Sequence, residues 1–135
     1  MLRSVDLSDY MLHNPFKVAP DDDVFSAINI MIENKITGVC VVDENEKLLG
    51  VLSELDCLKA ILSATYNEEA SVGNVSDFMT SDLDACGLHE DVVDVAADML
   101  KKSQRRRPVI DETGKLVGQI TCRQLLKVVS QFNQK

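Results

Sequence analysis

Long apolar runs and an excess of basic residues are both absent from this sequence of 135 residues. No run approaches the roughly 20 apolar residues of a membrane-spanning helix, and residues 1–6 contain no apolar core of a secretion signal. The chain has 14 Lys and Arg residues against 22 Asp and Glu residues, which leaves a net charge of −8. So acidic a chain is poorly suited to general binding of nucleic acids or anionic membranes. We therefore expect a cytoplasmic protein with neither kind of partner.

Cysteine pairs at metal-ligand spacing are also missing. None of the four cysteines forms a C-x-x-C pair, and neither histidine lies at ligand spacing from a cysteine. These residues are Cys40, Cys57, Cys86, Cys122, His13 and His89. We expect reduced, buried or half-buried thiols and no metal site.

An internal repeat is the most informative feature of the sequence. With a shift of 68 residues, positions 8–61 align without a gap with positions 76–129, and 14 of the 54 pairs are identical. The identical pairs include Asp9/Asp77, Asp23/Asp91, Val41/Val109, Gly50/Gly118 and Leu58/Leu126. Residues 64–75 carry no strong pattern and are interpreted as a connector.

Each copy predicts the element order β-α-β-β-α. In the first copy we expect strands at 16–18, 39–42 and 48–52, a helix after the carboxylates at 21–23, and a second helix from Ser53 through Ile61. The expected apolar stripe of that second helix consists of Leu55, Leu58, Ile61 and Leu62. The fold class is therefore α/β (α+β), with repeats at 1–66 and 67–135 packed by a pseudo-twofold into one compact module.

Motifs in both copies resemble those of a known family. The first copy carries Asp9-Tyr10-Met11, Val41-Val42-Asp43 and Gly50-Val51-Leu52-Ser53-Glu54-Leu55-Asp56; the second carries Asp77-Phe78-Met79-Thr80, Arg107-Pro108-Val109-Ile110-Asp111 and Gly118-Gln119-Ile120-Thr121. From about Val5 to Val129 the chain resembles a tandem pair of CBS (cystathionine-β-synthase) domains, a stand-alone Bateman module. The resemblance implies a regulatory module that holds adenosine-containing ligands in clefts between its two copies. It also implies a homodimer of modules.

The first copy contains the family's ligand motif, Gly-x-x-Ser/Thr-x-x-Asp, as Gly50, Ser53 and Asp56. Ser53 begins a predicted helix, where free backbone N–H groups favour a phosphate. The Asp56 carboxylate can accept two hydrogen bonds from a ribose diol. The alternative is a capping box, which uses the same Ser-x-x-Asp spacing and needs no ligand.

The second copy departs from this motif. Thr121 is retained, but Gln124 replaces the aspartate. Thr-x-x-Gln still suits a capping box, yet the amide lacks the anionic pair of acceptors that a diol prefers. Ribose binding is therefore less favoured in this copy, although both residues stay among the candidate ligand contacts.

Arg105-Arg106-Arg107 forms a basic cluster directly before Pro108. The resemblance implies that a basic residue two or three places before this proline contacts ligand phosphates, and guanidinium groups suit that contact. Arg107 is a further candidate, but it stands where the family usually has an apolar residue. The alternative is a solvated loop paired with acidic neighbours. Lys17 and Thr80 are weaker candidates for ligand contact.

Three functions are compatible with these patterns. The leading hypothesis is an adenine-nucleotide sensor (for AMP, ADP or ATP) that acts as a homodimer and signals to a regulated protein partner. The second is a degenerate pair that serves as a dimerisation adaptor without a small ligand. The third, an enzyme, is disfavoured because the sequence contains no nucleophile–base pair, phosphate-binding loop or metal cluster, so we expect no catalytic residues.

Overall fold

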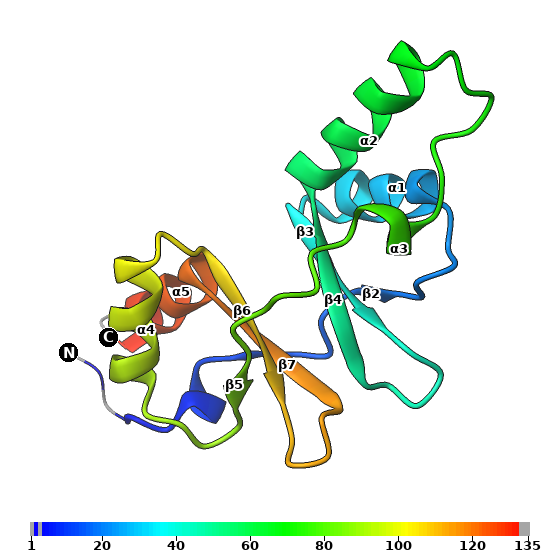
Figure 1. Cartoon of the computed structure of the whole chain (residues 1–135). Helices are drawn as coiled ribbons and strands as arrows, with labels where there is room; N and C mark the ends of the chain where they lie inside the picture. Colours follow the sequence, from blue (N-terminus) through cyan, green and yellow to red (C-terminus); the bar gives the residue numbers. More distant parts are fainter. Residues whose placement is uncertain (1, 3, 133–135) are drawn as a thin grey trace. The chain divides into compact units, whose positions relative to one another are not determined.

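The computed structural model describes residues 2 and 4–132, and the chain divides into two compact units (Figure 1). One unit is the continuous stretch Phe16–Leu83. The other joins Met1–Pro15 to Asp84–Lys135. We call them the continuous unit and the split unit. The boundary between the sequence repeats, at 66/67, therefore differs from the boundaries between the spatial units, because each unit is completed by the beginning of the other repeat.

The continuous unit contains the element order expected for one repeat. Its elements are β2 (Lys17–Val18), α1 (Val24–Asn34), β3 (Gly38–Val42), β4 (Leu48–Ser53), α2 (Glu54–Tyr66) and α3 (Val75–Phe78). The strand order is β2-β3-β4, with a parallel β2–β3 pair and an antiparallel β3–β4 pair. The Asp23 carboxylate accepts a hydrogen bond from the Phe25 amide and so begins α1; Lys35, in a left-handed conformation, ends it.

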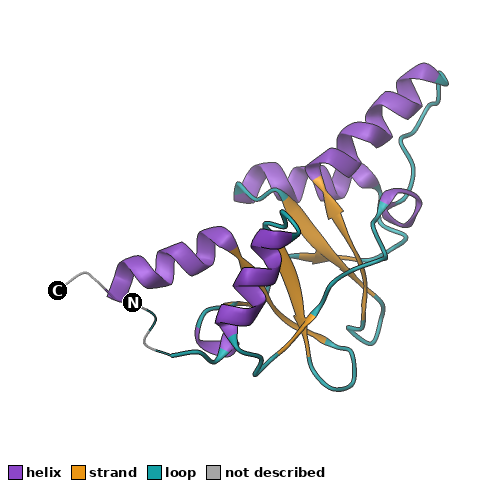
Figure 2. Ribbon diagram, turned by 60° about the vertical axis from the view of Figure 1, so that its left-hand side comes forward, coloured by secondary structure: helices purple, strands orange, loops and turns teal. Residues whose placement is uncertain are grey.

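The split unit repeats this order with an additional strand from the N-terminal segment (Figure 2). Its elements are η1 (Leu7–Asp9), β1 (Leu12–His13), β5 (Cys86–Gly87), α4 (Val92–Lys101), β6 (Arg106–Ile110), β7 (Leu116–Thr121) and α5 (Cys122–Phe132). The strand order is β1-β7-β6-β5. The predicted mixed fold of two β-α-β-β-α repeats is confirmed. None of the helices in the described part of the chain has the length and apolarity needed to cross a membrane.

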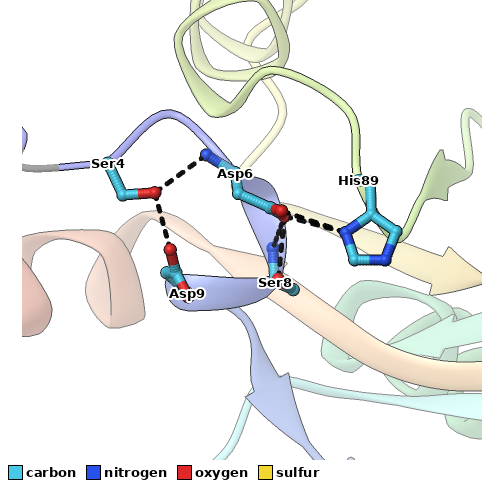
Figure 3. A network of polar contacts seen from close by, with 5 residues as sticks. All are labelled: Ser4, Asp6, Ser8, Asp9 and His89. Atoms are coloured by element: carbon cyan, nitrogen blue, oxygen red, sulfur yellow. Dashed lines mark hydrogen bonds and ion pairs between the residues drawn. The ribbon is translucent and has the colours of Figure 1, made fainter.

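Polar contacts fasten the N-terminal segment to the split unit (Figure 3). The Asp6 carboxylate accepts hydrogen bonds from the backbone and side chain of Ser8 and lies 3.0 Å from Nδ1 of His89. The Ser8 side chain, the Ser8 amide and then His89 hold the pKa of Asp6 below its usual value. The Ser4 hydroxyl donates to Asp9 at 2.6 Å and accepts from the Asp6 amide. The contact to His89 links this segment to the second repeat.

Backbone contacts and burial extend this attachment. The Leu7 amide donates to Glu90 O at 3.0 Å, and the Val92 amide donates to Val5 O at 2.7 Å. Leu7 and Tyr10 are fully buried in the core of the split unit. The core of the second repeat therefore includes residues from the beginning of the first repeat.

The predicted apolar stripe of α2 faces mostly away from the core of the unit. Leu55, Leu58 and Leu62 are 73%, 53% and 49% exposed, whereas only Ile61 of that stripe packs against the core. The buried residues of α2 are Cys57, Ala60 and Ala64. Small side chains let a helix approach its neighbours closely, and this leaves the larger leucines on the outer side. The helix also continues to Tyr66, beyond the expected end at Ile61.

Candidate functional site

Ser53 and Asp56 form a complete capping box at the beginning of α2. The Ser53 amide donates to Asp56 Oδ2 at 2.9 Å, and the Asp56 amide donates to Ser53 Oγ at 3.1 Å. The local structure predicted by the Ser-x-x-Asp spacing is therefore present without a ligand. The box uses Oδ2 of the carboxylate, so Oδ1 is the oxygen of Asp56 that the cap does not engage. Both side chains are half-buried, which leaves them accessible at the helix N-terminus.

Gly50 and Thr80 lie next to each other in the same unit. Thr80 pairs with Val51 of β4 through two backbone hydrogen bonds of 2.8 and 3.0 Å. A Cβ atom on Gly50 would lie 2.7 Å from the carbonyl oxygen of Thr80, so only glycine permits this approach. The sequence assigned Thr80 to the second copy, but the structure brings it to the ligand motif of the first.

The equivalent position in the split unit is occupied by Leu12. Leu12 pairs with Gln119 of β7, which corresponds to the pairing of Thr80 with Val51 at the repeat offset. The complete ligand motif, Gly50, Ser53 and Asp56, therefore lies in the continuous unit together with Thr80. The split unit instead combines Leu12 with Thr121 and Gln124. This distribution is not visible in the aligned repeats, because the segments that complete the two units are exchanged.

Lys17 lies at the opposite edge of the sheet from Thr80. The register places Lys17 beside Cys40, Cys40 beside Val51, and Val51 beside Thr80. The Lys17 ammonium forms an ion pair with Glu46, and both side chains are largely exposed. A phosphate would have to compete with Glu46 for this cation.

The split unit places two arginines beside the beginning of α5. Arg106 pairs with Thr121 in the β6–β7 ladder, and the carbonyl oxygen of Arg105 accepts from the Cys122 amide at 3.0 Å. Thr121 Oγ1 accepts from the Gln124 amide at 2.9 Å, so the predicted cap is formed. Arg105, Arg106, Thr121 and Gln124 are thus brought together by one strand pair and one helix N-terminus.

Arg107 is separated from the other two arginines. It is only 6% exposed; its Nε donates to Gln104 Oε1 at 2.7 Å and its Nη2 pairs with Asp98. Neighbouring residues of a strand point to opposite faces of the sheet, so Arg106 and Arg107 diverge. The candidate role of Arg107 as a ligand contact is not supported by this geometry, because both ends of its guanidinium group are engaged within the unit.

Asp98, Gln104 and Asp84 were not identified from the sequence. Hydrogen bonds from Arg107 and then Lys102 hold the pKa of Asp98 below its usual value. Hydrogen bonds from Gln104 and then Lys102 do the same for the pKa of Asp84. A signal for this cluster was present: an arginine at a normally apolar strand position requires buried polar partners.

Two cavities are lined by other residues. A groove of about 470 Å³ between α1 and α2 is lined mainly by apolar residues, among them Ile28, Met31, Leu58 and Ile61. A hollow of about 500 Å³ in the split unit is lined by residues 85–89 and 110–112. Neither contains a predicted ligand-binding residue. In the described residues, no three His, Cys, Asp or Glu side chains are close enough to hold a metal ion.

Comparisons with known proteins agree with the repeat. The family model of the CBS domain matches twice, over residues 7–63 and 75–131. Inosine-5'-monophosphate dehydrogenase of Aquifex aeolicus is 36% identical over 118 residues, which cover 87% of this chain and 23% of that protein. The chain spans about a quarter of the length of the first curated relatives that it matches.

Solved structures share the fold over nearly the whole chain. CBSX2 of Arabidopsis thaliana, in complex with AMP, has a TM-score of 0.85 and 28% identity, covering 97% of this chain and 100% of that one. A conserved protein from Pyrococcus horikoshii has a TM-score of 0.80 and 20% identity, covering 96% and 95%. The predicted family resemblance is confirmed by the two family matches.

Proposed function

Because the chain belongs to the CBS domain family, we propose that it is a regulatory module that binds an adenosine-containing nucleotide such as AMP, ADP or ATP. The observation that carries this proposal is the convergence of Gly50, Ser53, Asp56 and Thr80 in one unit. The proposed activity is binding rather than catalysis. The binding of AMP by CBSX2, which is 28% identical, supports the choice of ligand class.

Ser53 and Asp56 have separate roles in the proposed site. The capping box fixes the Asp56 side chain, so Oδ1 can accept hydrogen bonds from a ribose diol with little further loss of conformational freedom. The N-terminus of α2, a helix of 13 residues, favours a phosphate near Ser53. The exposed residue Thr80 adds a hydroxyl, and buried Gly50 permits the close approach of the Thr80 backbone.

Arg105 and Arg106 are the proposed phosphate contacts of the split unit. They flank the N-terminus of α5, where the helix dipole adds to their positive charge. In a chain with a net charge of −8, an anionic ligand depends on such local cations. We leave Arg107 out of this set because its guanidinium group is bound to Asp98 and Gln104.

A panel of ligands tests the proposed function. Adenosine, AMP, ADP, ATP and S-adenosylmethionine would each be titrated by calorimetry and by thermal unfolding. A ligand at 100-fold excess over its Kd should raise the free energy of unfolding by about 2.7 kcal/mol. GMP is the matched control for adenine recognition. Absence of binding by every adenosine compound would refute the proposal.

A dimerisation adaptor without a small ligand is the second candidate. Two observations favour it: the capping box of Ser53 and Asp56 is satisfied without ligand, and Leu12 and Gln124 weaken the motif of the split unit. The exposed leucines of α2 suit contact with a second copy of the chain, and we propose a C2 homodimer in either case. Such an interface should bury more than roughly 1,000 Å² in total.

A further inference from the structure

A polar cluster inside the split unit surrounds the guanidinium group of Arg107. Asp98 accepts from Arg107 and from Lys102, whose Nζ lies 3.2 Å from Asp98 Oδ2. Gln104 accepts from Arg107 Nε and donates to Asp84 Oδ2, both at 2.7 Å. Lys102 also reaches Asp84 at 3.3 Å. The charges of two carboxylates and two cations thus balance within the cluster. The neutral amide of Gln104 connects Arg107 to Asp84.

The cluster holds the turn that leads to the two proposed phosphate-binding arginines. Gln104 lies directly before Arg105, and its amide donates to Met99 O at 2.9 Å. Its side chain is bound on one side by Arg107 and on the other by Asp84. On the far side of the turn, Arg105 O accepts from the Cys122 amide. The segment from 104 to 107 is therefore fixed at both ends.

Side chains of neighbouring residues in a strand point to opposite faces of the sheet. Fixing the Arg107 side chain therefore also determines the side to which Arg106 points. Arg107 points into the polar cluster, so Arg106 is directed to the opposite face of β6, where Thr121 is its neighbour. The charge of Arg107 is compensated by Asp98 within the cluster.

The first repeat has apolar residues at the positions that form the polar cluster in the second. At the repeat offset, Ile30, Ile36 and Val39 occupy the positions of Asp98, Gln104 and Arg107, and all three pack in the core of the continuous unit. The left-handed turn residue is retained, as Lys35 in one unit and Ser103 in the other. The turn thus forms on an apolar core without polar partners. Only Arg107 of the cluster is buried, whereas Asp98, Lys102 and Asp84 are 39%, 45% and 41% exposed. Ion pairs that are exposed to this extent add little stability, so stability alone does not account for the polar cluster.

We propose that Arg107 is a positioning residue that sets the preference for ligand phosphates by holding Arg105 and Arg106, with Asp98 and Gln104 as its partners. This inference rests on the proposed function and adds to it a residue that determines the preference for phosphates. Polar residues replace the apolar core only in the unit whose turn leads to a pair of arginines. In the continuous unit, the positions of Arg105 and Arg106 are Thr37 and Gly38.

The test removes the polar cluster without supplying the apolar packing of the first repeat. A triple variant with Asp98→Ala, Gln104→Ala and Arg107→Ala would be compared with the double variant Arg105→Gln/Arg106→Gln and with both combined. Calorimetry would give Kd values for adenosine, AMP, ADP and ATP. Urea unfolding would establish that each variant is folded, and Arg107→Lys is the milder substitute if the triple variant is not.

The inference predicts a selective and non-additive loss. The triple variant should bind adenosine within about twofold of the unmodified chain, but lose about tenfold or more of the affinity contributed by phosphates. The combined variant should lose no more than the double variant, because both act through the same arginines. An unchanged phosphate preference, or an equal loss for adenosine, would overturn the inference.

Hydrogen exchange tests the positioning without any ligand. The amides of Gln104 and Cys122, which bond Met99 O and Arg105 O, should exchange at least about tenfold faster in the triple variant. The amide of Val51, bonded to Thr80 O in the other unit, is the control. If the unmodified chain binds no nucleotide, the proposed function fails, and exchange at Gln104 and Cys122 still decides the positioning role: unchanged exchange would refute it.

Discussion

Asp56 is the residue at which local structure and ligand chemistry overlap most closely. One of its oxygens closes the cap of α2, and the other is directed to no part of that cap. The same side chain can therefore stabilise the helix and accept hydrogen bonds from a ribose. Substitutions at this position must separate these two effects.

Replacement of Asp56 by Asn provides that separation. The Asn side chain retains an oxygen that can accept from the Ser53 amide, but it lacks the anionic acceptor. We expect a loss of AMP affinity of about 1.5–3 kcal/mol, roughly 10- to 150-fold, as for hydrogen bonds to a charged group. Stability should change little. Gln124→Ala is the control in the split unit and should weaken AMP binding much less; equal losses from the two substitutions would contradict the asymmetry between the units.

At the scale of the element, α2 presents its large side chains outward and its small ones inward. Cys57, Ala60 and Ala64 are buried, while Leu55 and Leu58 are more than half exposed. A face of this kind is consistent with the proposed C2 homodimer, in which the same surface of each copy is covered.

Leu58→Glu should weaken that dimer. A glutamate on this face would be desolvated on association and would lose the apolar contact of the leucine. We expect sedimentation equilibrium to show the dissociation constant raised by about tenfold or more, with secondary structure unchanged. Asn45→Glu adds the same charge in the exposed β3–β4 turn and should leave association unaltered. A dimer that tolerates Leu58→Glu would place the interface elsewhere.

The N-terminal segment is the second element for which we make a prediction, because it contributes a buried residue to the split unit. Leu7 is fully buried in the core of the split unit, whereas Leu12, five residues later, is 40% exposed. Leu7→Ala should lower the free energy of unfolding by about 2–5 kcal/mol, the range for large-to-small changes in a core. Leu12→Ala is the matched control and should cost much less. Similar urea midpoints for the two variants would mean that the segment does not stabilise the split unit.

For the whole molecule, lowered carboxyl pKa values predict acid sensitivity. The groups are Asp6, Asp84, Asp98 and Asp111, and hydrogen bonds are the leading cause in each case. The folded state binds protons less readily than the unfolded state at these groups. Their stabilising contribution is therefore complete above the unfolded pKa, about 3.8, and is lost as the pH falls through the folded values.

Urea unfolding between about pH 7 and pH 3 measures this dependence. The free energy of unfolding should fall as the pH drops below about 4. Asp111→Asn should reduce the slope, because the amide oxygen can still accept the hydrogen bonds of the Thr113 and Lys115 amides without titrating. A free energy of unfolding that stays constant down to about pH 3 would exclude a net role of these carboxylates.

The sequence by itself determined the repeat, the order of the elements and the ligand motif. Helical periodicity and capping signals are local. Asp23 begins α1 and Ser53 begins α2, as predicted, because a cap depends on residues two or three positions apart. The short connection between the strands expected at 39–42 and 48–52 likewise predicted a hairpin, which β3 and β4 form. Family membership followed from motifs that recur at a constant offset.

Only the tertiary structure decided which segments complete which unit. Backbone hydrogen bonds between Thr80 and Val51 bring Thr80 beside Gly50. The paired residues are about 30 positions apart in the sequence, and no local pattern encodes that pairing. The outward direction of the α2 leucines was also undetermined, because an apolar stripe does not indicate whether the core or another surface will cover it. Arg107 illustrates the same limit: its sequence neighbours suggested a phosphate contact, but burial beside Asp98 and Gln104 fixed its guanidinium group inside the unit.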